Sequence, residues 1–179
     1  MTAILKVDEI QDTSGNNIIN ENAGTITIGK SGDTVNLASG ATAGFGKVLQ
    51  VVTATDSTQR STTSTSFVTA SNTLSVSITP SSASNKVLIL VSSTIAGVNN
   101  DGVFTIFRDS TNLSSNGFIA HYNGGVGAYG SMGINVLDSP SSTSAITYQV
   151  YFKNNGGGNT SYLNYTSQKG SITAMEIAG

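Results

Sequence analysis

Apolar and polar side chains alternate with a period of two along most of the chain after residue 47. Leu74, Val76 and Ile78 share one face of an extended backbone, and the two intervening serines share the other. Every second side chain between residues 146 and 152 is again apolar, with Thr147, Gln149 and Tyr151 opposite. Alternation of this kind puts one apolar face on a β-strand. The pattern therefore predicts strands that pack face to face around a core.

Many such segments follow one another, separated by turns rich in Gly, Pro, Asn, Asp and Ser. Strands are expected over Val48–Thr53, Phe67–Ala70, Leu74–Thr79, Val87–Ile95, Val103–Arg108, Gly117–His121, Met132–Leu137, Ala145–Lys153, Ser161–Tyr165 and Ser171–Ile177. Short strands at this spacing are typical of an antiparallel β-sandwich or jelly roll. No window has the period and caps of an amphipathic helix. The chain is therefore expected to be all-β.

The run Val87–Val91 is apolar on both faces. A strand of this kind is buried from two sides. One side is expected to face the sandwich core. The other is covered either by a neighbouring subunit or by the rest of the core of a monomer, and the sequence leaves both interpretations open.

Before residue 47 the alternation occurs in two short, glycine-punctuated units. Ile26 and Ile28 alternate with threonines, and Val35 and Leu37 alternate with polar residues in the second unit. Two short strands cannot bury an apolar face within one chain, and repeated units become stable by stacking or by intertwining. We therefore expect a trimer stem in which these four side chains meet their counterparts from two other chains. The alternative is a surface hairpin packed on the following domain.

The first unit also fits the phosphate-binding pattern G-x-x-x-x-G-K-[ST] over residues Gly24 to Ser31. Its four variable positions are β-branched residues, which favour an extended strand over a curled loop. Turn residues precede it, at Ser14–Asn17 and Asn20–Ala23, and no helix follows to meet a phosphate. The match is therefore interpreted as a coincidence, and Thr25–Ile28 as a strand.

Composition narrows the classes of function. Charged residues make up 10% of the chain, against about 25% in an average protein, and the formal net charge is −2. With 37% hydrophobic residues, the chain is expected to fold on a framework of Ser, Thr, Asn and Gly. No basic run is present, so nucleic-acid binding is not expected. A neutral surface of hydroxyls and amides suits carbohydrate or further copies of the chain.

Cysteine is absent, which excludes disulfides and thiolate metal sites. Residues 1–20 lack the basic start and apolar core of a signal peptide. The longest aliphatic run, Val87–Val91, is far shorter than a membrane span. The expectation is a protein made in the host cytoplasm, without membrane insertion.

Several segments, in their order along the chain, carry a resemblance. Ser77–Ile89, Gly102–Asp109, Leu137–Tyr148 and Ser171–Ile177 together look like the β domain of structural proteins in tailed phages of marine bacteria. Leu5–Gly15, followed by the Thr25–Gly29 and Gly32–Leu37 units, is similar to the start of phage tail-fibre and virion-fibre proteins. The resemblance implies a jelly roll like the heads of complement C1q and tumour necrosis factor, which form trimers. The chain is short for a tail fibre, which implies a tip, an adaptor or a head fibre.

The resemblance and the patterns together predict a homotrimer with three parts. These are an attachment segment at residues 1–22, a β-repeat stem and linker at 23–46, and a jelly-roll head at 47–179. The expected function is that of a virion fibre protein. It would attach to another virion structural protein through its N-terminus and contact host surface glycan or protein through the head. The alternatives are a capsid-decorating head fibre without a receptor role and a polysaccharide-cleaving tailspike.

Candidate catalytic chemistry is sparse, so an enzyme is not expected, and neither is a cofactor or a metal. His121 is the single histidine, at the end of a strand beside a glycine-rich loop. A glycosidase needs two carboxylates at a defined separation, and the head offers candidates mostly in turns: Asp56, Asp101, Asp109, Asp138 and Glu176. Asn99–Gly102 lacks the spacing of a calcium loop and is interpreted as a turn.

Two loops have the composition of recognition surfaces. One is the glycine-rich segment 123–131 with its flanking aromatic residues, and the other is Asn154–Tyr162. Tyrosine supplies flat amphipathic area, and asparagine and serine supply adaptable hydrogen bonds. The candidate receptor-binding residues are His121, Tyr122, Tyr129, Asn155, Asn159 and Tyr162. The alternative is that these are solvated loops whose tyrosines pack on the sandwich.

Overall fold

The computed structural model describes residues 9–11, 13–14, 17–22, 25–28, 47–97, 102–114, 119–122, 129–156 and 159–179. The chain forms two compact units, Met1–Phe45 and Gly46–Gly179.

The first unit contains a small antiparallel sheet in the order β1-β2-β3. Its strands are β1 (Glu9–Gln11), β2 (Asn17–Asn22) and β3 (Thr25–Ile28). All four residues of β3 pair with β2, from Thr25 opposite Asn22 to Ile28 opposite Ile19. The variable positions of the phosphate-loop pattern are therefore a strand, as the β-branched residues predict.

One expectation for this unit is wrong. Residues 20–22 were expected in a turn, but they complete β2, because partners on both sides satisfy the backbone groups of this central strand. The sequence predicts a boundary between attachment segment and stem after residue 22. In the structure, β2 on one side of this boundary pairs with β3 on the other. The backbones of Ile26 and Ile28 lie in β3, whereas Val35 and Leu37 lie outside the described residues.

The described residues of the second unit form eleven strands and one short 3-10 turn. They are β4 (Val48–Asp56), β5 (Arg60–Thr62), β6 (Ser75–Ile78), β7 (Lys86–Gly97), β8 (Gly102–Arg108), β9 (Thr111–Asn112), β10 (Ala120–Tyr122), β11 (Tyr129–Asp138), β12 (Ile146–Asn154), β13 (Ser161–Leu163), η1 (Tyr165–Ser167) and β14 (Gly170–Ile177).

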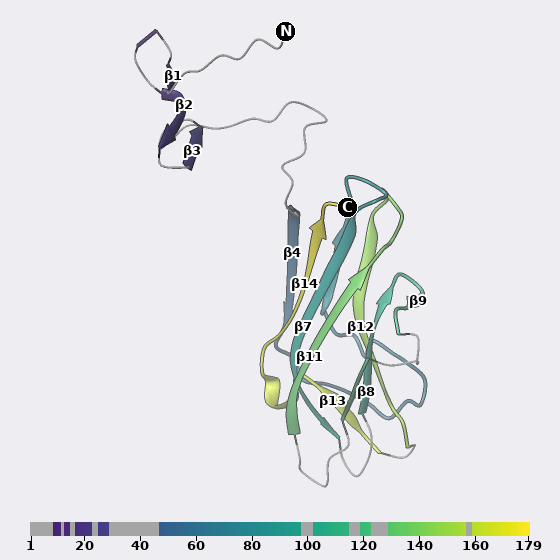
Figure 1. Cartoon of the computed structure of the whole chain (residues 1–179). Coiled ribbons are helices and arrows are strands. Elements are labelled where there is room, and N and C mark those ends of the chain that lie inside the picture. Colours follow the sequence, from purple (N-terminus) through teal and green to yellow (C-terminus); the bar gives the residue numbers. More distant parts are fainter. Residues whose placement is uncertain are drawn as a thin grey trace. The chain divides into compact units, whose positions relative to one another are not determined.

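These strands form two antiparallel sheets whose order is that of a jelly roll. The first sheet runs β4-β14-β7-β11; β13 pairs with β7 beyond the end of β14, and β5 pairs with β13. The second sheet runs β6-β12-β8-β10, with β9 beside β8. The pairs are nested along the chain, since β4 pairs with β14, β6 with β12, β7 with β11, and β8 with β10. Figure 1 shows the four main strands of the first sheet side by side. This nesting confirms the predicted jelly-roll sandwich.

The core lies between the two sheets and consists of the faces that the alternation predicts. Leu74, Val76 and Ile78 are buried, as are Ile146, Tyr148, Val150 and Phe152. The rings of Phe104 and Phe152 stack at 5.8 Å between centroids. At one edge the Tyr148 hydroxyl donates to Asp138, and Arg108 forms an ion pair with the same carboxylate at 2.9 Å. This pair joins β11 of the first sheet to β8 and β12 of the second.

The predicted strand over Phe67–Ala70 is wrong. Only Val68 forms a β-bridge, with Phe152, and the backbone then turns through positive φ angles at Ala70 and Ser71. The side chain of Asn72 closes this turn by donating to the carbonyls of Thr69 and Val150. Strands β5 and β9 were not predicted, because two or three residues are too few to show an alternation.

A buried carboxylate ties the β6–β7 connection to the first sheet. Glu176 of β14 is 1% exposed and accepts hydrogen bonds from the backbone and hydroxyl of Ser81, from Asn85 and from Gln50. Burial alone would raise the pKa of Glu176, but the hydrogen bonds from Gln50, Asn85 and Ser81 outweigh it and lower the pKa from 4.5 to about 2. The charged form of Glu176 therefore belongs to the folded state.

The hydrogen-bonded carboxylate of Glu176 predicts a specific dependence of stability on pH. Because the pKa of Glu176 is lower in the folded than in the unfolded chain, its contribution is complete above about pH 4.5 and is lost as the pH falls toward 2. Glu176→Gln should lower the free energy of unfolding by about 2–3 kcal/mol at pH 7, since it loses charged acceptors. The difference from the wild type, measured by urea unfolding, should shrink as the pH falls from 4.5 to 2. A difference that stays constant over this range would contradict the assignment.

Candidate functional site

The outer face of the first sheet carries the second apolar face of β7. Val87, Ile89 and Val91 point into the core, whereas Leu88 and Leu90 point outward and are half-buried. Strand β7 lies between β14 and β11, so it is central in its sheet. The second sheet covers the inward residues, whereas no further layer of the described chain covers the two outward leucines to the same extent.

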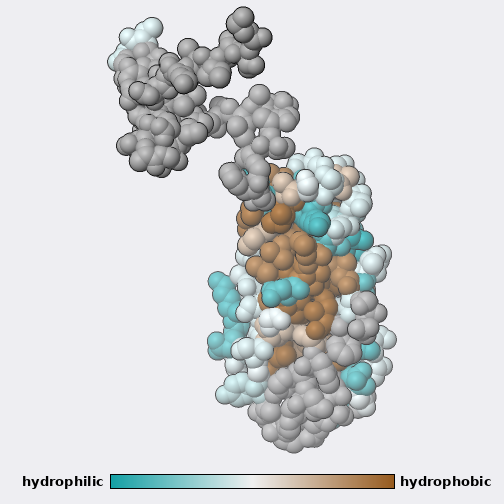
Figure 2. Space-filling model, viewed as in Figure 1, coloured by the Kyte–Doolittle hydropathy of each residue, from teal (hydrophilic) through white to brown (hydrophobic). Residues whose placement is uncertain are grey.

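Four side chains from four strands line up on this face. Met175 of β14 pairs with Val51 of β4 on one side and with Leu88 on the other, and Leu88 pairs with Leu137 of β11. We call these residues (Val51, Met175, Leu88 and Leu137) the aliphatic row. Val51 is 55% exposed and Leu137 is 57% exposed. Figure 2 shows the corresponding hydrophobic area over these strands. Exposed apolar area that spans a whole sheet is typical of an interaction surface.

The outer face of the second sheet is more deeply buried than that of the first. Val103 and Thr105 of β8 alternate with the core residues and so face outward, yet both are fully buried. An aromatic group covers this side: Phe107 contacts Tyr151 at 4.2 Å and Phe67 at 6.0 Å between ring centroids. The chain therefore closes the outer face of one sheet itself and leaves aliphatic side chains exposed on the other.

At the far end of the first sheet, three tyrosines gather on the same outer face. Ala96 of β7 pairs with Tyr129 of β11 on one side and with Tyr162 of β13 on the other. The ring of Tyr165, from η1, lies 5.9 Å from the Tyr129 ring and 5.4 Å from the Tyr162 ring. We call Tyr129, Tyr162 and Tyr165 the tyrosine cluster. Ala96 lies eight positions after Leu88 along β7, so the cluster lies roughly 26 Å from the aliphatic row.

The turn that carries Tyr165 is held by a buried side chain. Asn164 has a left-handed backbone (φ 53°) and is fully buried. Its side chain accepts a hydrogen bond from the hydroxyl of Ser93 and donates one to the carbonyl of Thr58. The threonine hydroxyl of Thr94 adds a bond to the Tyr165 carbonyl. These contacts fix Tyr165 on β7.

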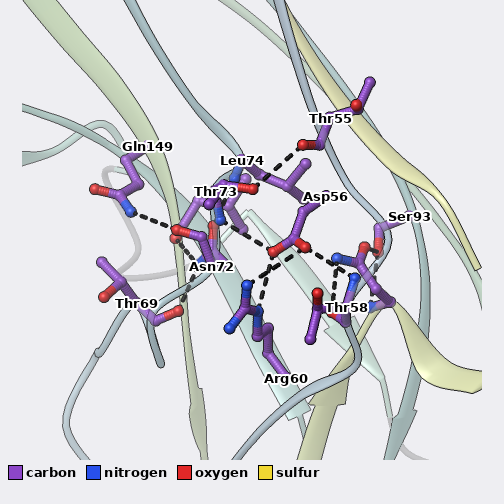
Figure 3. A network of polar contacts seen from close by, with 12 residues as sticks. Thr55, Asp56, Thr58, Arg60, Thr69, Asn72, Thr73, Leu74, Ser93 and Gln149 are labelled. Carbon is purple, nitrogen blue, oxygen red and sulfur yellow. Dashed lines mark hydrogen bonds and ion pairs between the residues drawn. The ribbon is translucent and has the colours of Figure 1, made fainter. Parts of the chain in front are cut away.

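Thr58 is in turn fixed by a second buried carboxylate. Asp56 accepts hydrogen bonds from the backbones of Thr58 and Thr73 and from the guanidinium of Arg60, which lies 3.0 Å away (Figure 3). Burial opposes ionisation, but these hydrogen bonds and the charge of Arg60 leave the pKa of Asp56 below its usual value. One polar network thus runs from the end of β4 to the turn below Tyr165.

The structure brings together only part of the predicted receptor-binding set. Tyr129 and Tyr162 become neighbours across Ala96. His121 and Tyr122 belong to β10 in the second sheet, where their backbones pair with Val103 and Gly102. Asn155 is exposed and Asn159 is half-buried, both in the connection between β12 and β13. Tyr165 was missed, although its position three residues after Tyr162 is a signal that the sequence contains.

Three of the carboxylates considered as catalytic candidates form hydrogen bonds or ion pairs that hold the fold together. Asp56 and Glu176 bind loop backbones, and Asp138 holds Arg108 and Tyr148. Asp109 accepts a hydrogen bond from the backbone of Thr147, and Asp101 lies outside the described residues. Within the described part of the chain, no three His, Cys, Asp or Glu side chains gather closely enough to hold a metal ion. The same residues contain no helix with the length and apolar character to cross a membrane.

Comparison with known proteins identifies no family. No protein-family model matches the sequence, and no curated protein matches it. Among solved structures, the chain is similar to a mutant VP2 protein of infectious bursal disease virus in derived T=1 particles, with 15% sequence identity and a TM-score of 0.37. The match covers 80% of this chain and 40% of that protein. The jelly-roll assignment therefore rests on the strand order, and any proposal about function has to be argued from the surface chemistry.

The role of Asn164 can be tested by two substitutions at one position. Asn164→Ala removes both amide hydrogen bonds, leaves buried partners unsatisfied and puts a residue less tolerant than asparagine in a left-handed backbone, so the free energy of unfolding should fall by about 2–4 kcal/mol. Asn164→Gly removes the same bonds but tolerates the backbone, and should be less destabilising by about 1 kcal/mol. Urea unfolding measures both, and near-ultraviolet circular dichroism reports on the tyrosines. If Asn164→Ala unfolds like the wild type, Asn164 does not anchor the turn.

Proposed function

We propose that this chain is a structural fibre protein of a tailed-phage virion, which assembles as a homotrimer and contacts the host surface through its jelly-roll head. The observation that carries the proposal is the aliphatic row, which crosses all four main strands of the first sheet on its uncovered face. Covering these side chains would stabilise an assembly by roughly 1 kcal/mol for each half-exposed side chain. Copies of the same chain are the partners that match this row.

The ends of the row favour a closed ring. Val51 lies on β4 at one edge of the sheet, and Leu137 lies on β11 at the other. A contact between different edges of successive copies is heterologous, and such contacts close into rings when the rotation allows. The number three comes from the resemblance to the trimeric heads of complement C1q and tumour necrosis factor.

The first unit supplies the other half of the proposal. Its three-stranded sheet belongs to the segment that resembles the start of phage fibre proteins. In the proposed fibre, the N-terminal segment binds another virion structural protein. The stem residues Ile26, Ile28, Val35 and Leu37 meet their counterparts around the axis.

A binding role for the head, rather than a catalytic one, is supported by its polar groups. Asp56, Asp138 and Glu176 are held by backbone and side-chain donors of their own fold. The tyrosine cluster instead has an exposed ring, that of Tyr129, packed beside two half-buried ones, and tyrosine is a residue favoured in recognition surfaces.

The assembly can be tested on the outer face. Val51→Asp combined with Leu137→Asp places a charge at both ends of the aliphatic row, where the side chains are more than half exposed and the fold does not depend on them. Because only the stem contacts would then hold the copies together, native mass spectrometry over a dilution series should show dissociation to monomers at a higher protein concentration than for the wild type, with unchanged circular dichroism. Ser77→Asp, an exposed change on β6 of the second sheet, is the matched control and should leave the mass unchanged. A trimer that dissociates at the same concentration as the wild type despite the double change would remove the row from the interface.

The surface role can be tested with host polysaccharide. Full-length protein immobilised on beads should retain polysaccharide chains without shortening them, which size-exclusion chromatography of the eluate would show. Shortened chains would replace the proposal with a depolymerase. A trimer that neither retains nor cleaves would favour the capsid-decorating head fibre, and a cryo-EM map of the particle would then place the chain on head or tail.

A further inference from the structure

We propose that the tyrosine cluster is a preorganised platform on which the neutral rings of a glycan stack. This inference rests on the proposed host-contact function and deepens it, because it names the site and the class of ligand. It also moves the site from the glycine-rich loops, where the sequence placed it, to the outer face of the first sheet.

The geometry provides a partly open aromatic surface. Tyr129 is 70% exposed, so most of its ring remains available to a ligand. Tyr162 and Tyr165 meet edge to face at 62°, which locks the two rings against each other. Between Tyr129 and Tyr162 on the strand lies Ala96, which is buried, and the Tyr165 ring contacts the tyrosine rings on both sides of it. The arrangement is one contiguous group of three rings, in which Tyr129 is exposed and the other two are half-buried.

The side chains around the cluster indicate a neutral ligand. The outward positions beside it are Thr94, Ser131 and Ser61; the two serines are exposed and offer hydroxyl groups, whereas the Thr94 hydroxyl donates to the Tyr165 carbonyl. Arg60, the neighbour of Ser61 in β5, is held in its ion pair with Asp56. An aromatic surface ringed by hydroxyls complements the apolar face and the hydroxyl rim of an uncharged sugar. Among these neighbouring described residues, Arg60 is the cation, and its ion pair with Asp56 leaves no free positive charge to bind an acidic sugar.

The turn below the cluster is held by hydrogen bonds and is strained. Thr166 and Ser167, directly after Tyr165, both have φ of 57°, a conformation that costs of order 1–3 kcal/mol in a β-branched residue. Thr166 is kept there by a hydrogen bond from its backbone to Gln59, and the preceding Asn164 is fixed to Ser93 and Thr58. A ring held in place before the ligand arrives loses little conformational freedom on binding.

The position of the cluster fits the proposed assembly. The aliphatic row and the cluster lie at opposite ends of one sheet face, roughly 26 Å apart along β7. Copies that pack along the row would present their clusters together at one end of the assembly. Several weak sugar sites held together in this way bind a repeating polysaccharide far more tightly than one site does.

The test uses the full-length assembled protein and an array of neutral and acidic bacterial oligosaccharides. Wild-type protein should bind neutral members preferentially. Tyr129→Ala should weaken binding to the best neutral glycan by about tenfold or more, measured by calorimetric titration. Tyr129→Phe keeps the ring and should change affinity less than about threefold. Tyr162→Ala is the second variant, and Ser77→Asp on the second sheet is the control that should bind like the wild type.

The outcomes separate this inference from the proposed function. If the wild type binds neutral glycans and Tyr129→Ala and Tyr162→Ala bind them equally well, the platform is overturned while the host-contact function stands. The platform is likewise overturned if the wild type prefers acidic glycans, or if the tyrosine variants lose the native mass of the assembly. Absence of binding to every glycan would instead overturn the glycan-contact function itself, and the platform with it.

Discussion

Strand β7 is the constraint on which the rest of the second unit depends. It pairs with β14 and β13 on one side and with β11 on the other, so it is the strand around which the first sheet is assembled. Its odd-numbered residues from Val87 to Ile95 supply one wall of the core. Its even-numbered residues supply Leu88 to the aliphatic row and the buried Ala96, which pairs with Tyr129 and Tyr162 of the tyrosine cluster. Because side chains alternate strictly along a strand, one strand sets both the core and the surface.

Buried polar groups fix the loops to this sheet. Glu176 holds the β6–β7 connection, Asp56 holds the segments around Thr58 and Thr73, and Asn164 holds the turn after β13. Each meets backbone groups that would otherwise be buried without partners, a situation that costs free energy. In a chain with so few charges, short polar side chains and a few buried carboxylates replace the surface ion pairs common in other proteins.

Much of the fold could be predicted because its strands are half-buried. The alternation at residues 74–78 and 146–152 identified the inward side chains correctly. The prediction failed where local sequence and backbone geometry diverge. Phe67–Ala70 has the composition of a strand, but the bonds from Asn72 impose a turn on it. The polar residues of β2 suggested a turn, but pairing on both sides makes them a strand.

The candidate site shows the same division more sharply. By itself the sequence determined that the chain is all-β, which residues of each strand share a face, and that Val87–Val91 is apolar on both sides. It also identified Tyr129 and Tyr162 as surface candidates. Only the tertiary structure decided that Val51, Met175, Leu88 and Leu137 form one row, and that Tyr165 joins the two tyrosines. Period two is a local property of the chain, whereas the register between strands distant in sequence is set by how both sheets close around a common core.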